Sequence, residues 1–173
     1  MSPAADELDA QLDRLKRDFD DSFKVSRRPF EEKLEDLLAI RLGREPFALR
    51  LSEVATIVAG PPITSVPSQH SALLGLAGLR GVLVSVFDLG LLLGLQRVAS
   101  VKWVLRVKDS STAFGFAELE GQFRAQARDA AADALEQRAV KGELHGAVRV
   151  WPLLNLSSLA RGLESAAGSL LEG

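Results

Sequence analysis

The first part of the chain carries an apolar stripe with helical spacing. Leucine and phenylalanine recur at steps of three and four residues, and charged residues occupy most positions between them. This spacing puts the apolar side chains on one face of a helix over residues 4–24. Three arrangements remain open for this helix: it packs onto its own domain, self-associates with a second copy of the chain, or docks on a partner. The stripe consists of Leu8, Leu12, Leu15, Phe19 and Phe23.

The pattern changes after Pro29. Because proline is tolerated in the first turn of a helix, we expect a second, short helix from Phe30 to Asp36. Between Leu38 and Leu51 apolar residues alternate with others, which is typical of strands. The segment Gly43–Pro46 interrupts the alternation and predicts the turn between two short strands.

The rest of the chain is organised around residues 75–95, GLAGLRGVLVSVFDLGLLLGL. Glycine reaches positive φ at little cost, so Gly78–Gly81 predicts a tight turn. Leu76–Ala77 before it and Val82–Phe87 after it would be the arms of a hairpin. Asp88 can then cap a short helical turn that begins at Leu89. Arg80 is the one charged residue of the predicted turn.

Further strands are expected on both sides of this hairpin. Residues 52–58 mix apolar and polar positions, and their pattern alone does not separate strand from helix. Residues 101–108 alternate clearly, and residues 112–116 would form the return strand. Residues 122–140 are rich in alanine and long straight side chains, which favours a helix there.

The sequence also repeats itself weakly. Several residues of the central stretch have a similar residue 67 positions later, without a gap. We therefore expect two related halves. The pairs are Gly75 and Gly142, Val86 and Leu153, Asp88 and Asn155, Leu89 and Leu156, and Leu92 and Leu159.

These patterns divide the chain into three parts. Residues 1–36 would be a helical extension, residues 37–164 the main domain, and residues 165–173, which are small and polar, a flexible tail. Strands dominate the main domain, so the fold class is mainly β with helical additions.

Composition narrows the function classes. The chain has no cysteine, and its two histidines, His70 and His145, lack a second ligand at metal-binding spacing, so we expect no metal site. A formal charge of −2 gives no reason to propose nucleic-acid binding. The N-terminus lacks the apolar core of a signal peptide, and no apolar run is long enough to cross a bilayer. We expect a cytoplasmic protein with no direct membrane insertion.

Catalysis is not expected either. Ser85, His70 and Asp88 could form a triad on paper, but no serine lies in a nucleophile-elbow pattern. The glycines of the central stretch do not follow a nucleotide-binding motif, so no cofactor is expected. A small-molecule-binding or enzymatic β-barrel stays open as an alternative that would require a polar, concave pocket.

The central stretch closely resembles the most recognisable segment of the CheW-like domain, the chemotaxis coupling protein family. The family pattern is G-(V/I)-x-N-L-R-G-x-(V/I)-(V/I)-P-(V/I)-(V/I)-D-L. It is met here by Gly75, Leu79-Arg80-Gly81, Leu83-Val84, Val86 and Asp88-Leu89. Two upstream segments, Phe47-Ala48-Leu49 and Ser52 to Ile57, also resemble family segments, in the same order and spacing.

The resemblance implies two intertwined, SH3-like five-stranded β-barrels. It also implies that residues 52–58 form a short helical turn leading into a strand. The implied function is that of a non-enzymatic adaptor. It would couple the cytoplasmic tip of a chemoreceptor to the regulatory domain of a CheA-type histidine kinase.

The resemblance places the protein-binding surface around Arg80, because the matching arginine of the family belongs to the surface that meets the receptor. Leu79 and Gly81 flank it, and Val54 and Thr56 complete the candidate set. From residue type alone, Arg80 could equally be a solvated charge or a partner of a nearby carboxylate, and Val54 a core residue.

Some positions depart from the family pattern. Gly78 replaces an asparagine, Ser85 a proline and Thr56 an acid. Because charges often decide which partner binds, these departures support a second hypothesis. In it, the chain is a specialised scaffold for another partner, in polar localisation, motility or a different kinase pathway, with the N-terminal helix as docking arm.

Overall fold

The computed structural model describes residues 34–126 and 139–171, together with five positions near the N-terminus. The chain divides into two compact units, Met1–Lys33 and Leu34–Gly173. The predicted helix over residues 4–24 lies mostly outside the described residues and stays a prediction. The five described positions have helical backbone: Ala10, Gln11, Asp13, Arg14 and Arg17.

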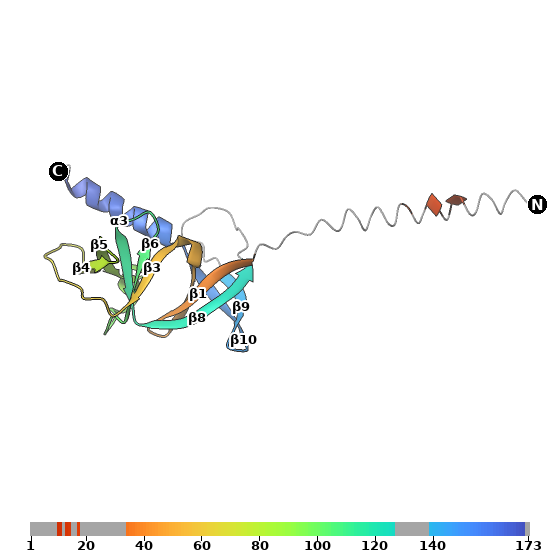
Figure 1. Cartoon of the computed structure of the whole chain (residues 1–173), viewed down its shortest axis with the longest axis horizontal. Coiled ribbons are helices and arrows are strands. Elements are labelled where there is room, and N and C mark those ends of the chain that lie inside the picture. Colours follow the sequence, from red (N-terminus) through yellow and green to blue (C-terminus); the bar gives the residue numbers. More distant parts are fainter. Residues whose placement is uncertain (1–9, 12, 15–16, 18–33, 127–138, 172–173) are drawn as a thin grey trace, which may run out of the picture. The chain divides into compact units, whose positions relative to one another are not determined.

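The unit Leu34–Gly173 is built mainly from strands (Figure 1). In its described part, ten strands are joined by one short 3-10 turn, η1, and two helices, α2 and α3. In chain order these are β1 (Leu34–Leu42), β2 (Glu45–Arg50), η1 (Leu51–Glu53), β3 (Val54–Ala59), β4 (Leu73–Leu79), β5 (Val82–Asp88), α2 (Leu89–Leu92), β6 (Trp103–Val107), β7 (Thr112–Phe116), β8 (Glu118–Gln126), β9 (Ala139–Leu144), β10 (Ala147–Leu154) and α3 (Leu156–Leu171).

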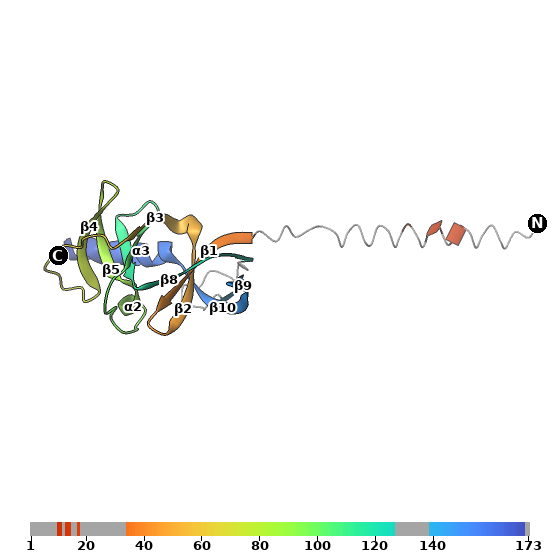
Figure 2. The same ribbon diagram turned by 60° about the horizontal axis from the view of Figure 1, so that its bottom comes forward.

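The strands form two five-stranded sheets that exchange strands between the two halves of the unit. The first sheet has the order β8-β1-β2-β10-β9, and the second has the order β3-β6-β7-β5-β4. The two orders correspond strand by strand: each strand of the first sheet has, at the same place in the second sheet, the strand whose number differs by five. Each sheet therefore takes two strands from one half and three from the other, as Figure 2 shows for β1 and β2 beside β8, β9 and β10. Two intertwined halves were predicted, and this part of the prediction is confirmed.

The repeat predicted from the sequence is also visible in the connections. In each half an antiparallel hairpin leads into a helix, β4–β5 into α2 and β9–β10 into α3. Asp88 caps α2 and Asn155 caps α3, through hydrogen bonds of 3.0 Å and 2.9 Å from the backbone N–H groups of Leu91 and Ser158. The two caps are one of the predicted residue pairs.

Only the first sheet nearly closes into a barrel. Its outer strands β8 and β9 lie against each other, whereas β3 and β4 in the second sheet do not pair. The reason is the connector between them, which runs along the outer side of β4 and forms a bridge between Thr64 and Leu76. The prediction of two barrels is therefore correct in strand number and wrong in the closure of the second.

The core has a shared centre and one interior for each sheet. Along β1, Leu38, Ile40 and Leu42 face the shared centre, whereas Leu37 and Ala39 face the interior of the first sheet. This period of two explains why β1 is buried on both faces. The shared centre also receives Phe114 and Phe116 from β7 and the first leucine of each helix, Leu89 and Leu156.

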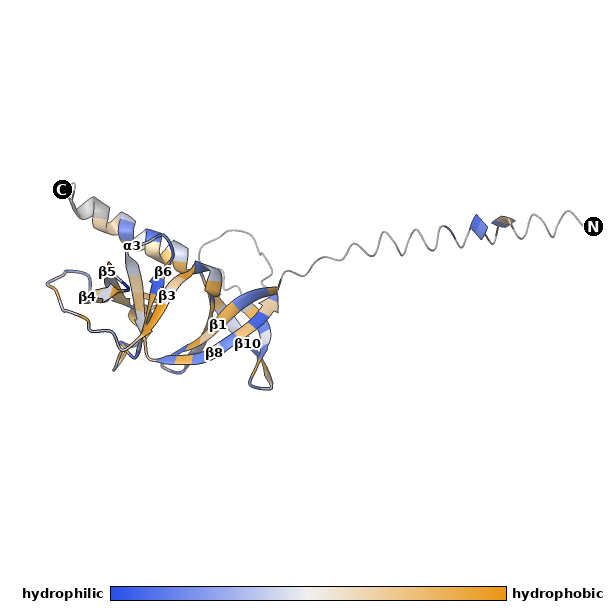
Figure 3. Cartoon of the chain, in the orientation of Figure 1, coloured by the Kyte–Doolittle hydropathy of each residue, from blue (hydrophilic) through white to orange (hydrophobic). Residues whose placement is uncertain are grey.

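The helix predicted over residues 122–140 is wrong where the structure describes it. Residues 122–126 belong to β8 and residues 139–140 to β9, while residues 127–138 lie outside the described residues. In β8 hydrophobic and hydrophilic residues alternate (Figure 3). Phe123 packs against Trp151 with ring centroids 4.4 Å apart. Burial on one face of a sheet outweighs the local helix propensity.

The short helix predicted from Phe30 to Asp36 is wrong in its last three residues, because β1 begins at Leu34. Asp36 pairs across the sheet with Arg124 of β8, and its carboxylate accepts a 2.8 Å hydrogen bond from that guanidinium. This hydrogen bond lowers the pKa of the Asp36 carboxyl.

At the other end, α3 continues through residues 165–171, which were predicted as a flexible tail. The first turns of α3 bury Leu156 and Ala160 in the shared centre, and this anchors the helix. The remaining strand predictions agree with β1, β2, β6 and β7, and residues 52–58 form η1 followed by β3 as the resemblance implied.

Candidate functional site

The β4–β5 hairpin ends in a two-residue turn, tighter than the four-residue turn predicted. Arg80 and Gly81 both have positive φ, 48° and 82°, as in the turns that best match the twist of paired strands. Leu79 and Val82 pair directly below the turn, and Leu79 is buried in the interior of the second sheet. Arg80 is exposed. The hairpin therefore holds a charged side chain outside on a tip anchored by a core leucine.

The hairpin is fixed to its connector at Gly75. The backbone N–H and C=O of Leu76 form two hydrogen bonds of 2.8 Å with Thr64. Gly75 has φ +148°, and a Cβ atom there would lie 2.1 Å from the carbonyl oxygen of Thr64. The close approach of connector and strand therefore requires glycine at this position.

The base of the hairpin is fixed by Asp88, which is fully buried. One carboxylate oxygen accepts a hydrogen bond from the Leu91 N–H, and the other accepts a 2.9 Å bond from the Val98 N–H. The predicted capping role of Asp88 is confirmed. The second contact, to the loop after α2, was not predicted.

A groove of about 950 Å³ opens beside the start of β3. Its walls come from η1 and β3, the β6–β7 turn, the start of β5 and the middle of α3. The groove combines apolar and charged side chains. Its main apolar residues are Leu51, Val54 and Val82, and its charged residues include Arg106, Lys108 and Glu164.

Glu53 and Glu164 hold α3 in place at the edge of this groove. The Glu53 carboxylate accepts hydrogen bonds of 3.3 Å and 3.2 Å from the N–H groups of Leu156 and Ser157, at the start of α3. An anionic side chain at this end of a helix satisfies free N–H groups and suits the helix dipole. Glu164, further along α3, accepts hydrogen bonds from the hydroxyls of Ser110 and Thr112.

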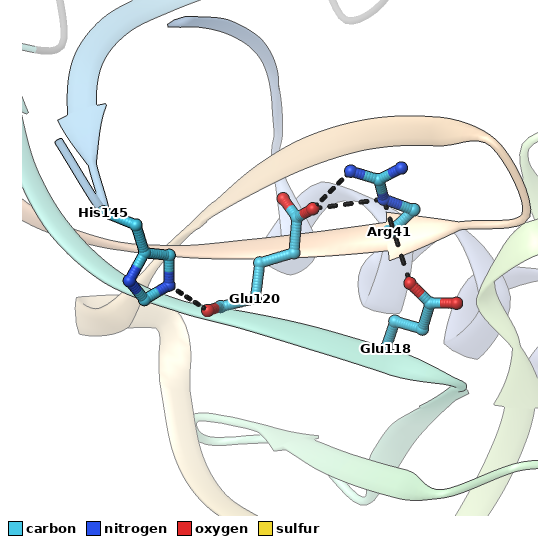
Figure 4. A network of polar contacts seen from close by, with 4 residues as sticks. All are labelled: Arg41, Glu118, Glu120 and His145. Carbon is cyan, nitrogen blue, oxygen red and sulfur yellow. Dashed lines mark hydrogen bonds and ion pairs between the residues drawn. The ribbon is translucent and has the colours of Figure 1, made fainter. Parts of the chain in front are cut away.

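A separate polar network lies on the first sheet (Figure 4). Arg41 on β1 donates to Glu120 and lies 3.8 Å from a carboxylate oxygen of Glu118, both on β8. The hydrogen bonds with Glu120 raise the pKa of Arg41. His145 in the β9–β10 turn contacts the backbone oxygen of Glu120 at 3.0 Å. The network joins β1, β8 and the β9–β10 hairpin, so it supports the closure of the first sheet.

Within the described ranges, no group of three or more histidine, cysteine, aspartate or glutamate side chains is placed to hold a metal ion. In the part of the chain that the structure describes, no helix has both the length and the apolar character needed to span a membrane.

Comparison with known families agrees with this geometry. The model of the CheW-like domain family matches residues 36–164, which contain both sheets except the first two residues of β1, together with the first half of α3. The chain belongs to the CheW-like domain family.

Two individual relatives show how far this CheW-like chain has diverged. A probable chemotaxis protein CheW from Rhizobium etli is 31% identical over 61 residues, which are 35% of this chain and 39% of the relative. The matched segment thus spans about two fifths of that protein. The crystal structure of the scaffolding protein TtCheW from Thermoanaerobacter tengcongensis superposes with a TM-score of 0.56 at 15% identity. The superposition covers 70% of this chain and 89% of TtCheW, and this similarity supports the fold.

In this CheW-like structure, the five candidate protein-binding residues lie in three different places. Val54 is half-buried and lines the groove, and Thr56 lies two residues further along β3. Leu79 is a core residue, whereas Arg80 and Gly81 form the exposed tip. Val54 therefore shares the groove with Val82, the residue directly after the tip, but the other four candidates do not line it.

The sequence analysis of this CheW-like chain missed the charged side of the groove. Arg106 and Lys108 lie on or next to β6, and Glu164 comes from α3. One signal was present: Arg106 is a charged residue between Leu105 and Val107 in an otherwise apolar strand. No local pattern connects Glu164 or Glu53 with this site.

Proposed function

We propose that this CheW-like chain is a non-enzymatic chemotaxis adaptor. It would couple the cytoplasmic tip of a chemoreceptor to the regulatory domain of a CheA-type histidine kinase. The observation that carries the proposal is the groove that contains Val54 and Val82, directly after the exposed tip of Arg80 and Gly81. A groove with apolar residues is suited to the apolar face of a helix, and chemoreceptor tips are helical hairpins.

The adaptor works as a scaffold on which no bond is made or broken. The receptor helix would lie along the groove, and Arg80 would contact its polar side. The kinase domain would use exposed apolar residues elsewhere, for which the β9–β10 hairpin offers Val148 and Val150, 62% and 57% exposed. Both partners would then be held in a fixed relation by one unit with strands exchanged between its halves. This function places the protein in the cytoplasm, next to receptor arrays.

Replacing Arg80 by glutamate tests the receptor contact. We expect the Arg80→Glu variant to bind a receptor-tip fragment at least about tenfold more weakly, because a charge on the contact surface is reversed. Binding would be measured by titration calorimetry with full-length protein. Arg44→Glu is the matched control, since Arg44 is another exposed arginine in a hairpin turn, between β1 and β2. Wild-type protein that retains neither a receptor fragment nor a kinase fragment at micromolar concentration contradicts the proposal.

A second candidate function keeps the fold and changes the partner. Thr56 stands where the family pattern has an acid, which favours a specialised scaffold in polar localisation, motility or a different kinase pathway. Residues 1–33 would then act as docking arm or self-association segment. Deleting them distinguishes the two: a general coupler keeps its kinase affinity and its mass in solution, whereas a dedicated arm loses a partner or a dimer. Affinity capture and light scattering measure these outcomes.

A further inference from the structure

Arg106 is a cation without a carboxylate partner in the groove. It lies on β6, where its neighbours across the sheet are Thr56 on β3 and Ala113 on β7, neither of them charged. No ion pair in the described part of the chain includes Arg106. Among the described residues, its side chain donates one hydrogen bond, from Nη1 to the neutral carbonyl oxygen of Ser110, at 3.3 Å.

The Nε–H group of Arg106 is buried and has no hydrogen-bond partner. A buried donor that is left unpaired costs about 1–3 kcal/mol, and a charged group costs more, so such groups normally find an acceptor. The carboxylates nearby do not serve as one. Glu164 accepts hydrogen bonds from Ser110 and Thr112, and neither Asp109 nor Glu164 forms an ion pair with Arg106.

The surroundings of Arg106 define the chemistry that would satisfy it. Lys108, exposed two residues further on, adds a second positive charge to the same groove, which also contains the carboxylates of Asp109 and Glu164. Leu51, Val54 and Val82 add apolar side chains. A ligand complementary to this surface carries a carboxylate next to apolar groups. On a helix, this means an aspartate or glutamate three or four residues from a leucine or valine.

We propose that Arg106 is a specificity residue of the groove, which pairs with a carboxylate on the receptor helix docked there. This inference rests on the proposed function, because it names the chemistry of the receptor segment bound at that site. On docking, the side chain would turn so that the Nε–H, which is buried in the unbound protein, and one terminal N–H donate to the two carboxylate oxygens, the geometry in which arginine binds acids most strongly. Thr56, directly opposite, would leave the guanidinium available to the partner rather than neutralise it.

The test uses full-length protein and soluble receptor-tip fragments. For a fragment that binds the wild type, we expect Arg106→Gln to weaken binding by about tenfold to a hundredfold, because a partly buried charge pair is lost. Lys102→Gln is the matched control, since it removes an exposed positive charge next to the same strand but outside the groove, and should leave the affinity unchanged. Thermal unfolding of both variants verifies that the fold is intact.

A second measurement keeps the wild-type adaptor and changes the fragment. Each aspartate and glutamate of the fragment is replaced by its amide in turn. We expect one replacement to weaken wild-type binding as much as Arg106→Gln does, and to have no further effect on that variant. If binding survives Arg106→Gln and every amide replacement, the role of Arg106 is wrong while the proposed function stands. If the wild type binds no receptor fragment, the proposed function is wrong and the role of Arg106 falls with it.

Discussion

Replacing Gly75 by alanine should destabilise the protein by about 3–5 kcal/mol. The new Cβ would lie 2.1 Å from the carbonyl oxygen of Thr64, so backbone must move on one side or the other. Such a movement breaks the two hydrogen bonds between Thr64 and Leu76. Alanine would also have to adopt φ +148°, which side chains with a Cβ atom rarely do.

Urea unfolding monitored by tryptophan fluorescence measures this effect, since Trp103 lies in the second sheet together with Gly75. Gly78→Ala is the matched control on the same strand. A Cβ atom there meets nothing within 4 Å, so we expect a change of less than about 1 kcal/mol. Equal urea midpoints for the wild type and Gly75→Ala would show that the connector makes no steric contact that excludes a Cβ atom at this position of β4.

Replacing Asp88 by alanine should destabilise the protein by about 2–5 kcal/mol. The carboxylate is fully buried, and both oxygens accept hydrogen bonds from backbone N–H groups, of Leu91 and of Val98. Alanine leaves both donors, which belong to half-buried residues, without this acceptor, and a donor left unpaired costs about 1–3 kcal/mol where it is buried. We expect the loop after α2 to loosen first, because the Val98 contact holds it to the base of the hairpin.

Asn155→Ala is the control for Asp88→Ala. Asn155 occupies the corresponding position in the second half, but it is exposed and its side chain caps α3 through a single hydrogen bond. Its loss should cost only about 1 kcal/mol. Hydrogen exchange of the Leu91 and Val98 amides distinguishes the effects, since Asp88→Ala alone should accelerate it. Equal costs for the two substitutions would mean that burial adds nothing to the role of Asp88.

Local patterns in the sequence predict much of this fold. The alternation in β1, β2, β6 and β7, the β4–β5 hairpin and the Asp88 cap each depend on residues a few positions apart. For the same reason Arg80 and Gly81 could be placed on a tip in advance. The CheW-like resemblance added what local patterns lack, the intertwining of two halves.

Features that depend on distant contacts could not be predicted in this way. Residues 122–126 have helical composition, but Phe123 is buried against Trp151 of another hairpin, and that contact makes them a strand. The Glu53 carboxylate binds the start of α3 at a sequence separation of 103 residues. The charged side of the groove likewise forms only when α3 brings Glu164 to the β6–β7 turn.

The exchange of strands between the halves also has a consequence for folding during synthesis. When the ribosome has finished β1 to β5, β1 and β2 still lack three sheet neighbours, and β3 to β5 lack β6 and β7, which would join them. Neither sheet can be completed until the later strands emerge, so the two sheets are gained or lost together. A chain with this topology therefore has no partly folded form in which one sheet alone is complete.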